Sequence, residues 1–416
     1  MYMVGKKTED TGGGFVTDRL YYEDAYLTEF EAQVLEVRPE EGGWAVRLDR
    51  SAFYPTSGGQ PYDTGELGGR RILDVYVDAS GEVWHRLDGE LSAGQKVVGR
   101  IDWPRRFDHM QQHAGEHMLA GAVHRLLGGR TIGLHCGADI SSIDVDMPEG
   151  RTRIDEEEIR MLEDEVNDEI QRDVPIRCWF PGEEELKALP LRKAPSVTSH
   201  VRVVAIGEKE YCACGGTHPS SSGQIGLMKV VDVRPSKGKM RMFFLCGKRA
   251  YEDYRARMKA SDRAAALLSA AVDELPQAVE RTLEKLKLVE AEIARVRREA
   301  ALARIDELMQ SARPMGGCKL IKAHLGEADM ETLKQMAGKM IEQSGVVVLL
   351  AARGEKAENL LFARSPDAPG VMGKLMSESA RAHGGKGGGR PDFAQGSAMD
   401  PAVLDTAEGL LRAQIG

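Results

Sequence analysis

The stretch that organises this sequence is DHMQQHAGEHMLAGAVHRLLGG, residues 108–129. It predicts a helix that begins at Asp108, a residue able to cap a helix, and ends at Leu127, where two glycines stop it. Leucine, valine and alanine recur on one face, which indicates packing on a core. His113 and His117 are one turn apart on another face, so both imidazoles can approach the same point.

On the N-terminal side of this helix, short runs alternate apolar and polar residues between clusters of Gly, Pro and Asp. Such runs predict strands, and they cover residues 31–37, 44–48, 72–77 and 83–87. Strands this short and this closely spaced predict a small antiparallel β-barrel. Between them lies FYPTSGGQPYDTG, residues 53–65, which contains too much Gly and Pro for a strand interior and predicts a long turn.

On the C-terminal side, strands are predicted over 140–145, 201–206, 226–233 and 241–244, with an acidic helix over 155–171. Strands mixed with helices in this way favour an α+β domain.

From residue 248 to 310, Ala, Glu, Arg and Leu dominate, and apolar residues recur at alternating steps of three and four. This pattern indicates a helical hairpin or a coiled coil. Pro276 predicts one helix that ends near Leu275 and a second that runs to about Met309. Apolar runs over 319–322 and 346–352 then predict buried strands of a final α/β domain.

Composition bounds the class of protein. The 416 residues suggest two to four folding units. The 56 Lys and Arg against 65 Asp and Glu give a net charge of −9, which argues against coating nucleic acid through bulk positive charge but leaves local basic faces open. The longest apolar run is far shorter than the roughly 20 residues of a membrane span, and no secretory signal begins the chain. We therefore expect a cytoplasmic protein without membrane association, in which the six cysteines form no disulfide framework.

Two clusters have the spacing of metal ligands. The first is the His113 and His117 pair, and the second is Cys214-Gly-Gly-Thr-His218, where two glycines let the backbone bring a thiolate and an imidazole together. Three nitrogens and one sulfur suit tetrahedral zinc. Two half-sites in a chain with 10 His and 6 Cys make coincidence improbable, and we expect one Zn²⁺ per chain.

The first cluster also fits the H-x-x-E-H pattern of zinc proteases, in which Glu116 would act on water. That interpretation needs a further carboxylate ligand and leaves Cys214 and His218 without a purpose. On an ideal helix Glu116 faces about 60° from the midline of the histidines, so a solvated carboxylate or one that supports a ligand is an equal alternative.

These motifs resemble a known family. The two metal half-sites, the Gly-Gly-Gln-Pro-x-Asp-x-Gly run that ends at Gly65, and the stretch over 131–144 resemble the editing domain of alanyl-tRNA synthetases and, more closely, the free-standing alanyl-tRNA deacylases called AlaX. The tail over 384–397 resembles the DHH-associated C-terminal domain of those synthetases. The resemblance covers the chain beyond its first residues in the order of the long AlaX form. No aminoacylation core precedes it, so synthesis of alanyl-tRNA is not expected.

The resemblance implies hydrolysis, in trans, of the ester that joins serine or glycine to tRNA(Ala). It assigns the zinc ligands to His113, His117, Cys214 and His218. Zinc can acidify a water, polarise an ester carbonyl or hold the substrate, although four protein ligands are typical of a closed structural site.

Further candidate residues fall into two groups. Thr217 and Glu116 are candidates for catalysis. Substrate contacts are expected from residues with bare backbone or positive charge, which are Gly58, Gly59, Gln60, Gly388, Gly389 and Arg390. Clusters of Lys and Arg over 229–241 and 374–390 are expected to offer local positive faces to the tRNA.

The expected fold class is α+β with a helical spacer. The predicted domains are a disordered leader (1–14), an N-terminal small β-barrel domain (15–107), a zinc-binding α+β editing domain (108–247), a helical hairpin or coiled coil (248–312) and a C-terminal DHH-associated-type α/β domain (313–416). The coiled coil or the last domain offers a route to a homodimer. Two alternatives remain: a zinc metalloprotease of the H-x-x-E-H type, and a non-catalytic tRNA-binding protein that zinc stabilises.

Overall fold

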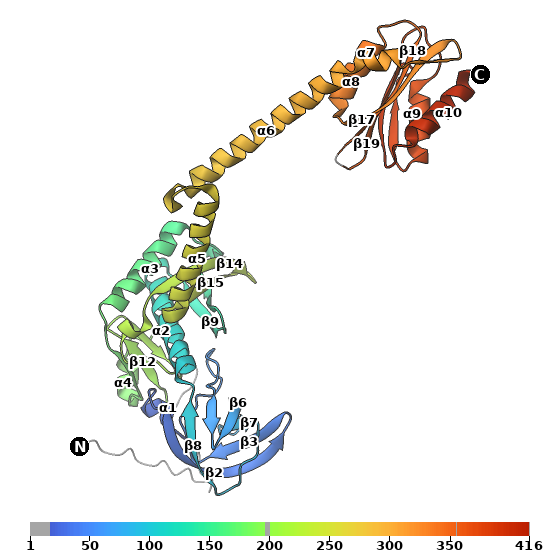
Figure 1. The fold of residues 1–416 in the computed structure, drawn as a ribbon. Helices are drawn as coiled ribbons and strands as arrows, with labels where there is room; N and C mark the ends of the chain where they lie inside the picture. The colour runs from blue at the N-terminus through green and yellow to red at the C-terminus, as the bar shows by residue number, and fades with distance from the viewer. Residues whose placement is uncertain (1–16, 196–199, 355, 416) are drawn as a thin grey trace. The chain divides into compact units, whose positions relative to one another are not determined.

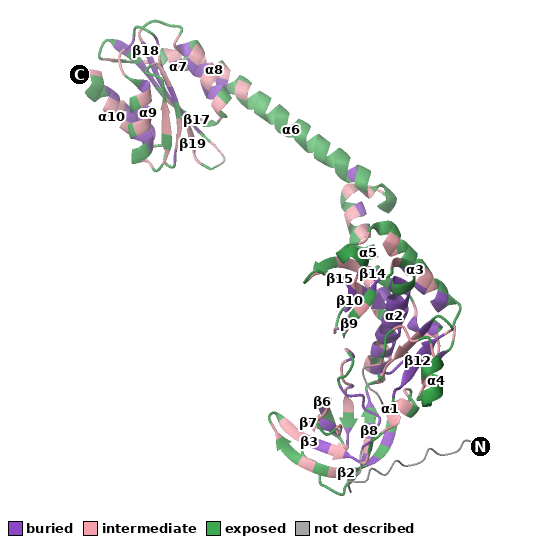
Figure 2. Cartoon of the chain, turned by 180° about the vertical axis from the view of Figure 1, so that it is seen from behind, coloured by how far each residue is buried: buried purple, intermediate pink, exposed green. Residues whose placement is uncertain are grey.

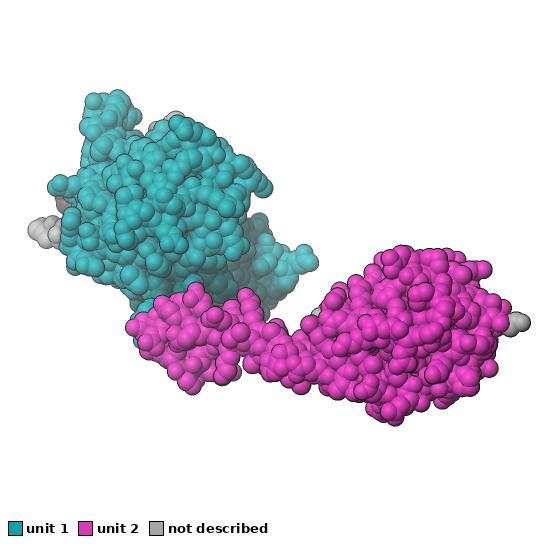
Figure 3. All heavy atoms as spheres, turned by 90° about the horizontal axis from the view of Figure 1, so that it is seen from above, with its two compact units in different colours: residues 1–261 teal, residues 262–416 magenta. Residues whose placement is uncertain are grey.

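The computed structural model describes residues 17–195, 200–354 and 356–415. They form two compact units, residues 1–261 and 262–416, which Figure 3 colours separately. The predicted disordered leader over 1–14 lies outside the described residues. No helix in the described part of the chain is long and apolar enough to span a membrane. The mixed α+β class is confirmed (Figure 1).

The N-terminal part of unit 1 is a closed six-stranded barrel, which confirms the predicted small barrel. Around the barrel the order is β2 (Glu29–Glu40), β3 (Gly43–Leu48), β7 (Val83–Leu87), β6 (Arg70–Val77), β5 (Gly65–Leu67) and β8 (Lys96–Ile101). Alternate apolar residues such as Val46, Val75 and Leu87 are fully buried in its core. Closure pairs every strand on both sides, which removes free edges. The short elements β1 (Asp18–Arg19), α1 (Leu20–Glu23) and β4 (Arg50–Ser51) lie beside it.

Helix α2 (Trp103–Leu127) follows the barrel and is buried over most of its length (Figure 2). The prediction that it begins at Asp108 is wrong. Asp102 is the N-cap residue, its carboxylate accepts a hydrogen bond from the Arg105 amide, and a proline occupies the first turn. Proline favours that position because its missing N–H would have no helical partner there. The helix ends as predicted, at the left-handed Gly128.

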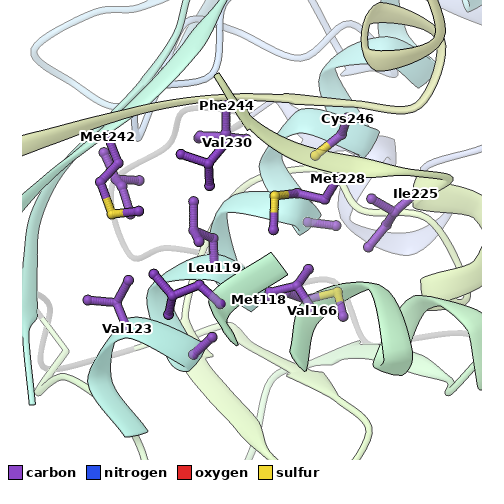
Figure 4. Packing of buried hydrophobic residues seen from close by; sticks show 14 of the residues in the cluster. Met118, Leu119, Val123, Val166, Ile225, Met228, Val230, Met242, Phe244 and Cys246 are labelled. Atoms are coloured by element: carbon purple, nitrogen blue, oxygen red, sulfur yellow. The ribbon is translucent and has the colours of Figure 1, made fainter. Parts of the chain in front are cut away.

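Two sheets and a helix complete unit 1 around α2. One sheet has the order β14 (Met228–Ser236), β15 (Lys239–Cys246), β10 (Ser141–Asp146) and β9 (Arg130–Cys136), and the other has the order β11 (Ile176–Trp179), β12 (Val203–Ile206) and β13 (Glu210–Ala213). The predicted acidic helix is α3 (Glu156–Gln171). Figure 4 shows Leu119 and Val123 of α2 packed with Val166 of α3 and Phe244 of β15. The remaining short elements are η1 (Pro148–Gly150), α4 (Glu183–Ala188) and η2 (Ser222–Ile225).

Four helical elements follow. They are α5 (Gly247–Leu268), η3 (Val272–Glu274), α6 (Leu275–Ala303) and α7 (Ile305–Gln310). The prediction that the first helix ends near Leu275 is wrong: it ends at Leu268, because Ser269 takes a left-handed φ of 51°. Pro276 begins α6 instead of ending its predecessor. Most of α6 is exposed (Figure 2).

The C-terminal part of unit 2 is a six-stranded sheet covered on both faces. Its order is β16 (Arg313–Met315), β17 (Cys318–Glu327), β18 (Val346–Arg353), β19 (Glu358–Arg364), β21 (Phe393–Ala398) and β20 (Lys386–Gly389). Alternate residues of β18 enter two cores: Val347 lies in the core with α9 (Met372–Ala382) and α10 (Val403–Ile415), and Val348 lies in the core with α8 (Met330–Met340). A strand buried on both faces reads as a continuous apolar run, as predicted for 346–352.

Candidate metal centre

The structure brings the two predicted half-sites together inside unit 1. His113 and His117 lie one turn apart on α2. Cys214 and His218 lie in the loop after β13, whose Cys214 amide and carbonyl are both bonded to Arg202. Their ligand atoms all lie within 4.8 Å of one another. The three histidines are no more than 3% exposed, and Cys214 is half-buried, so the imidazoles are shielded from water while the thiol side of the cluster is less so.

The geometry of the cluster centres on the thiol. Cys214 Sγ lies 3.4 Å from Nε2 of His113 and 3.4 Å from Nε2 of His218. The His113 and His117 rings are stacked with centroids 5.1 Å apart, and His218 lies 4.5 and 5.0 Å from them. Both ring nitrogens of His117 and Nδ1 of His218 are buried without a hydrogen-bond partner. Buried polar atoms are rarely left unpaired, and a cation in the cluster would bind one ring nitrogen of each histidine.

Burial sets the protonation of these groups. It lowers the pKa of His113 to about 3, with Arg202 and His109 lowering it further, and it holds the pKa of His117 and of His218 well below the usual value. The imidazoles are therefore neutral, the form that binds metals. Burial raises the pKa of the Cys214 thiol to about 12, which the Gly216 amide opposes by donating to Sγ. Three neutral nitrogens and one thiol that ionises on metal binding match a zinc donor set.

The loop over 53–65 reaches this centre through Gln60, which is fully buried. Gln60 Oε1 lies 3.2 Å from the Thr217 amide nitrogen and 2.8 Å from His113 Nδ1. The Thr217 backbone N–H can only donate a hydrogen bond, which identifies the Gln60 atom beside it as the amide oxygen. That oxygen can only accept from His113 Nδ1, so His113 carries its proton on Nδ1. The Nε2 lone pair of His113 is consequently directed at the cluster.

The same loop is fixed at both ends. Gly59 has a φ of 84°, and a Cβ there would lie 2.5 Å from the Leu134 carbonyl oxygen of β9, so only glycine fits. Asp63 is fully buried against Arg106 of α2, whose Nε lies 2.9 Å from each carboxylate oxygen. The barrel loop is thereby attached to the helix that carries the two histidines.

The remaining predicted site residues of unit 1 are Thr217, Glu116 and Gly58. Thr217 is fully buried, and its Oγ1 accepts a hydrogen bond of 2.8 Å from Gln60 Nε2. Glu116 is 4% exposed, which removes the solvated alternative, and its carboxylate lies 3.8 Å from His117 Nδ1. Burial raises the pKa of Glu116 to about 7, with Arg192 opposing and Glu210 adding to the rise. Gly58 is left-handed, and open space surrounds its Cβ position.

Three predicted site residues lie in unit 2. Gly388 and Gly389 belong to β20, the edge strand of the six-stranded sheet, and Arg390 follows directly. Open space surrounds the Cβ position of Gly388. Neither of the two glycines has a positive φ, so their backbone is a regular strand and does not form the αR–αL nest that binds anions. Arg390 is exposed and pairs with Asp392.

Sequence reasoning missed the residues that support the ligands. Arg202 donates to the carbonyl oxygens of Cys214 and Gly216. A Cβ on Gly216 would lie 2.1 Å from His113 Cε1, so this glycine serves close packing as well as backbone freedom. Glu210 lies 4.0 Å from His117 Nδ1. Arg202 and Glu210 belong to no spacing pattern, and Gly216, although part of the Cys214-x-x-x-His218 motif, packs against a ligand about a hundred residues away along the chain.

Comparisons with known proteins give two matching families and several relatives that align with most of this chain. The Threonyl and Alanyl tRNA synthetase second additional domain matches residues 201–242, and the DHHA1 domain matches residues 317–416. The alanyl-tRNA editing protein AlaX-L of Pyrococcus horikoshii is 30% identical over 412 residues, covering 96% of this chain and 100% of that protein. The alanine–tRNA ligases of Pyrococcus abyssi and Archaeoglobus fulgidus are 33% and 34% identical, covering 92% and 94% of this chain. This chain spans 42% and 43% of the length of those two ligases.

Proposed function

The chain belongs to the AlaX-L family of alanyl-tRNA editing proteins, and we propose that it hydrolyses the ester of tRNA(Ala) mischarged with serine or glycine, acting in trans. The observation that carries the proposal is the cluster of three imidazoles and one thiol in unit 1, two of whose members, Cys214 and His218, lie within the residues that the synthetase second additional domain matches.

We propose zinc as the ion, with His113, His117, Cys214 and His218 as its ligands. The neutral imidazoles, the unpaired ring nitrogens and the nearby thiol support this assignment. Zinc held there would supply Lewis-acid chemistry to an ester carbonyl. The chain's own residues hold the donors in place: Gln60 fixes the tautomer of His113, and Arg202 fixes the loop that carries the other two ligands.

The other candidates divide by burial. Thr217 and Gln60 are fully buried and bonded to each other, which favours positioning of the centre over contact with the aminoacyl group. Glu116 lies beside the ligands, 3.8 Å from His117 Nδ1, with no hydrogen-bonding partner fixed on its carboxylate among the described residues, and a carboxyl group in such a place can transfer a proton during ester hydrolysis. Glu116 is therefore our candidate for the group that moves a proton.

The tRNA is proposed to contact the positive face of unit 2. In unit 1, the cations over 229–241 are largely neutralised, because Lys229, Arg234, Lys239 and Arg241 pair with neighbouring carboxylates. In unit 2, Arg381 and Lys386 are exposed and form no ion pair with any described residue. Unpaired cations beside a glycine strand with open space at Gly388 favour a phosphate backbone as the ligand.

We further propose that α6 forms a parallel coiled coil with a second copy of the chain. Val279, Leu286 and Ile293 recur every seven residues, Val289 and Val296 lie three residues after the last two of them, and all five side chains are at least 44% exposed. The C-terminal end of α6 packs through a different face, which includes Ala301, in the core that contains α8. A heptad seam exposed along four turns needs a partner helix to cover it.

The charges beside the seam favour the parallel, in-register arrangement. In such an arrangement a g residue faces the e residue five positions later in the partner. Three of these pairs are of opposite sign, Lys285 with Glu290, Glu292 with Arg297, and Glu299 with Arg304, and the first pair, Ala278 with Leu283, is uncharged. Some of these groups have other partners, including Arg295 and Glu327, but such exposed ion pairs contribute only about 0.2–1 kcal/mol and exchange readily.

The experiment is the release of amino acid from separately prepared Ser-, Gly- and Ala-tRNA(Ala) by full-length protein, before and after removal of its metal. Release of serine or glycine with alanine spared, lost with the metal and regained with Zn²⁺, is the expected result. No release by folded, zinc-loaded protein would refute the editing proposal and leave a tRNA-binding role. Peptide cleavage without ester cleavage would favour the metalloprotease alternative.

A further inference from the structure

The ring edge of His117 that carries Nδ1 faces two carboxylates. Glu116 Oε2 lies 3.8 Å and Glu210 Oε1 lies 4.0 Å from this nitrogen. His117 is 3% exposed, and neither of its nitrogens has a hydrogen-bond partner. With Nδ1 facing the carboxylates, Nε2 on the opposite side of the ring is the atom free to bind the ion of the centre. A neutral imidazole that binds metal through Nε2 carries its proton on Nδ1 and needs an acceptor there.

Glu210 is held firmly in that place. It begins β13 and is 4% exposed. Arg192 Nε donates to its Oε1 at 2.7 Å, while the Arg192 backbone amide bonds to the Tyr211 carbonyl oxygen. On the other side the carboxylate lies against α2 at Gly121, where a Cβ would come within 2.5 Å of Glu210 Oε2. The absence of a side chain at Gly121 is what lets this carboxylate approach the helix beside His117.

We propose that Glu210, fixed by Arg192, is the positioning residue that accepts the Nδ1–H of His117 when Nε2 binds the metal. The inference rests on the zinc centre proposed above and deepens it. A carboxylate acceptor fixes the ring tautomer and orientation and raises the basicity of the ligand nitrogen. Glu210 thus does for His117 what the buried Gln60 does for His113.

Glu116 is the less suitable acceptor, although its distance is similar. It precedes His117 on the same helix, and side chains at adjacent helical positions diverge by about 100°. No described residue fixes its carboxylate, whereas Glu210 comes from a facing strand and is held by a cation.

The same place could be taken for a second metal site, because ligand atoms of His117, Glu210 and Cys212 also lie within 4.8 Å of one another. The guanidinium of Arg192 argues against that. It already donates to one oxygen of the Glu210 carboxylate, and its side chain is only 12% exposed, so its positive charge beside the carboxylate is poorly screened and would repel a second cation. A hydrogen bond from Nδ1–H requires no second positive ion beside it.

The test is the Zn²⁺ affinity of the full-length protein, measured by competition with a chromophoric chelator. Removing Glu210 alone leaves Arg192 as a buried unpaired charge, so the principal variant replaces the pair by apolar groups, Arg192→Met with Glu210→Leu, a change that proteins often tolerate. We expect its affinity to be about 10–100-fold weaker than wild type. The matched variant Arg192→Met with Glu210→Gln also removes the ion pair but keeps an amide oxygen that can accept the hydrogen bond, so it should retain most of the affinity.

Two controls decide between the alternatives. Cys212→Ala should leave both the affinity and a stoichiometry of one zinc per chain unchanged. An unchanged Zn²⁺ affinity in the apolar double variant would overturn the assignment to Glu210. If Glu116→Gln instead lost about 10–100-fold in affinity while the apolar double variant did not, Glu116 would be the acceptor. Two zinc ions per wild-type chain, reduced to one by Cys212→Ala, would show a second metal site instead. If the wild-type protein binds no zinc, the proposed zinc centre itself is wrong. If the wild-type protein and the apolar double variant bind zinc equally well, the centre stands and only the role of Glu210 is wrong.

Discussion

Replacing Asp63 by asparagine should lower the free energy of unfolding of unit 1 by about 3–5 kcal/mol. Asp63 and Arg106 are both 0% exposed. The remaining donors of Arg106 bond to the carbonyl oxygens of Ala25 and Ala52, so its guanidinium cannot turn toward water. The substitution keeps the shape of the side chain but removes its charge, and Arg106 would remain as an uncompensated buried cation.

The magnitude can be checked against an exposed pair in the same unit. Arg100 and Glu29 meet through Nε and a carboxylate oxygen at 2.8 Å, but their side chains are 62% and 58% exposed. Water screens such a pair, so Glu29→Gln should cost only about 0.2–1 kcal/mol. The two substitutions remove the same charge from the same kind of ion pair, and burial is the variable that differs between them.

The assay is urea-induced unfolding followed by tryptophan fluorescence. All four tryptophans, at positions 44, 84, 103 and 179, lie in unit 1, so the signal reports on that unit alone. Equal destabilisation by Asp63→Asn and Glu29→Gln would refute the reasoning. Because the loop that ends near Asp63 also carries Gln60 to the centre, the Asp63→Asn variant should bind zinc more weakly than the control variant.

Three further predictions concern the barrel, the centre and the spacer. Burial lowers the pKa of His85 to about 4, below its ordinary value of about 6.5. The unfolded chain therefore takes up a proton that the folded protein does not, and unit 1 loses stability as the pH falls from 6.5 toward 4. His85→Asn should reduce the dependence of the unfolding free energy on pH by about 1.4 kcal/mol per pH unit, measured by urea unfolding at pH 5 and 6.5. Gly216→Ala places a methyl group against a ligand imidazole and should weaken zinc binding by about tenfold or more in chelator competition, whereas Gly215→Ala should not. Lys285→Glu should weaken the dimer in sedimentation equilibrium, and addition of Glu290→Lys should restore it, which an antiparallel arrangement would not predict.

The sequence predicted the parts of this fold that local patterns determine. Alternating runs identified the longer barrel strands, and a continuous apolar run identified β18. The start of α2 was missed because Asp108 and Asp102 both suit a cap. The proline two residues after Asp102 was the signal that distinguished them. Similarly, Pro276 was taken as a breaker although it begins α6.

The candidate site shows the same division. The ligand types and their spacing of four residues were visible in the sequence, and the structure brings those ligands together. The partners of the ligands were not visible, because the contact between Gln60 and His113 depends on how the barrel loop meets α2. A glycine-rich motif suggested contact with substrate, whereas Gln60 is fully buried against Thr217. Pattern alone cannot tell a residue that meets a substrate from one that supports a ligand.

The rate of serine release from Ser-tRNA(Ala) by the Cys214→Ala variant tests the central claim most directly, with Cys212→Ala, on the same segment two residues earlier, as the matched control. If a zinc centre held by Cys214 is required for editing, Cys214→Ala should lose serine release together with its zinc, while Cys212→Ala keeps both. Serine release at the wild-type rate by folded, zinc-free Cys214→Ala protein would contradict the account.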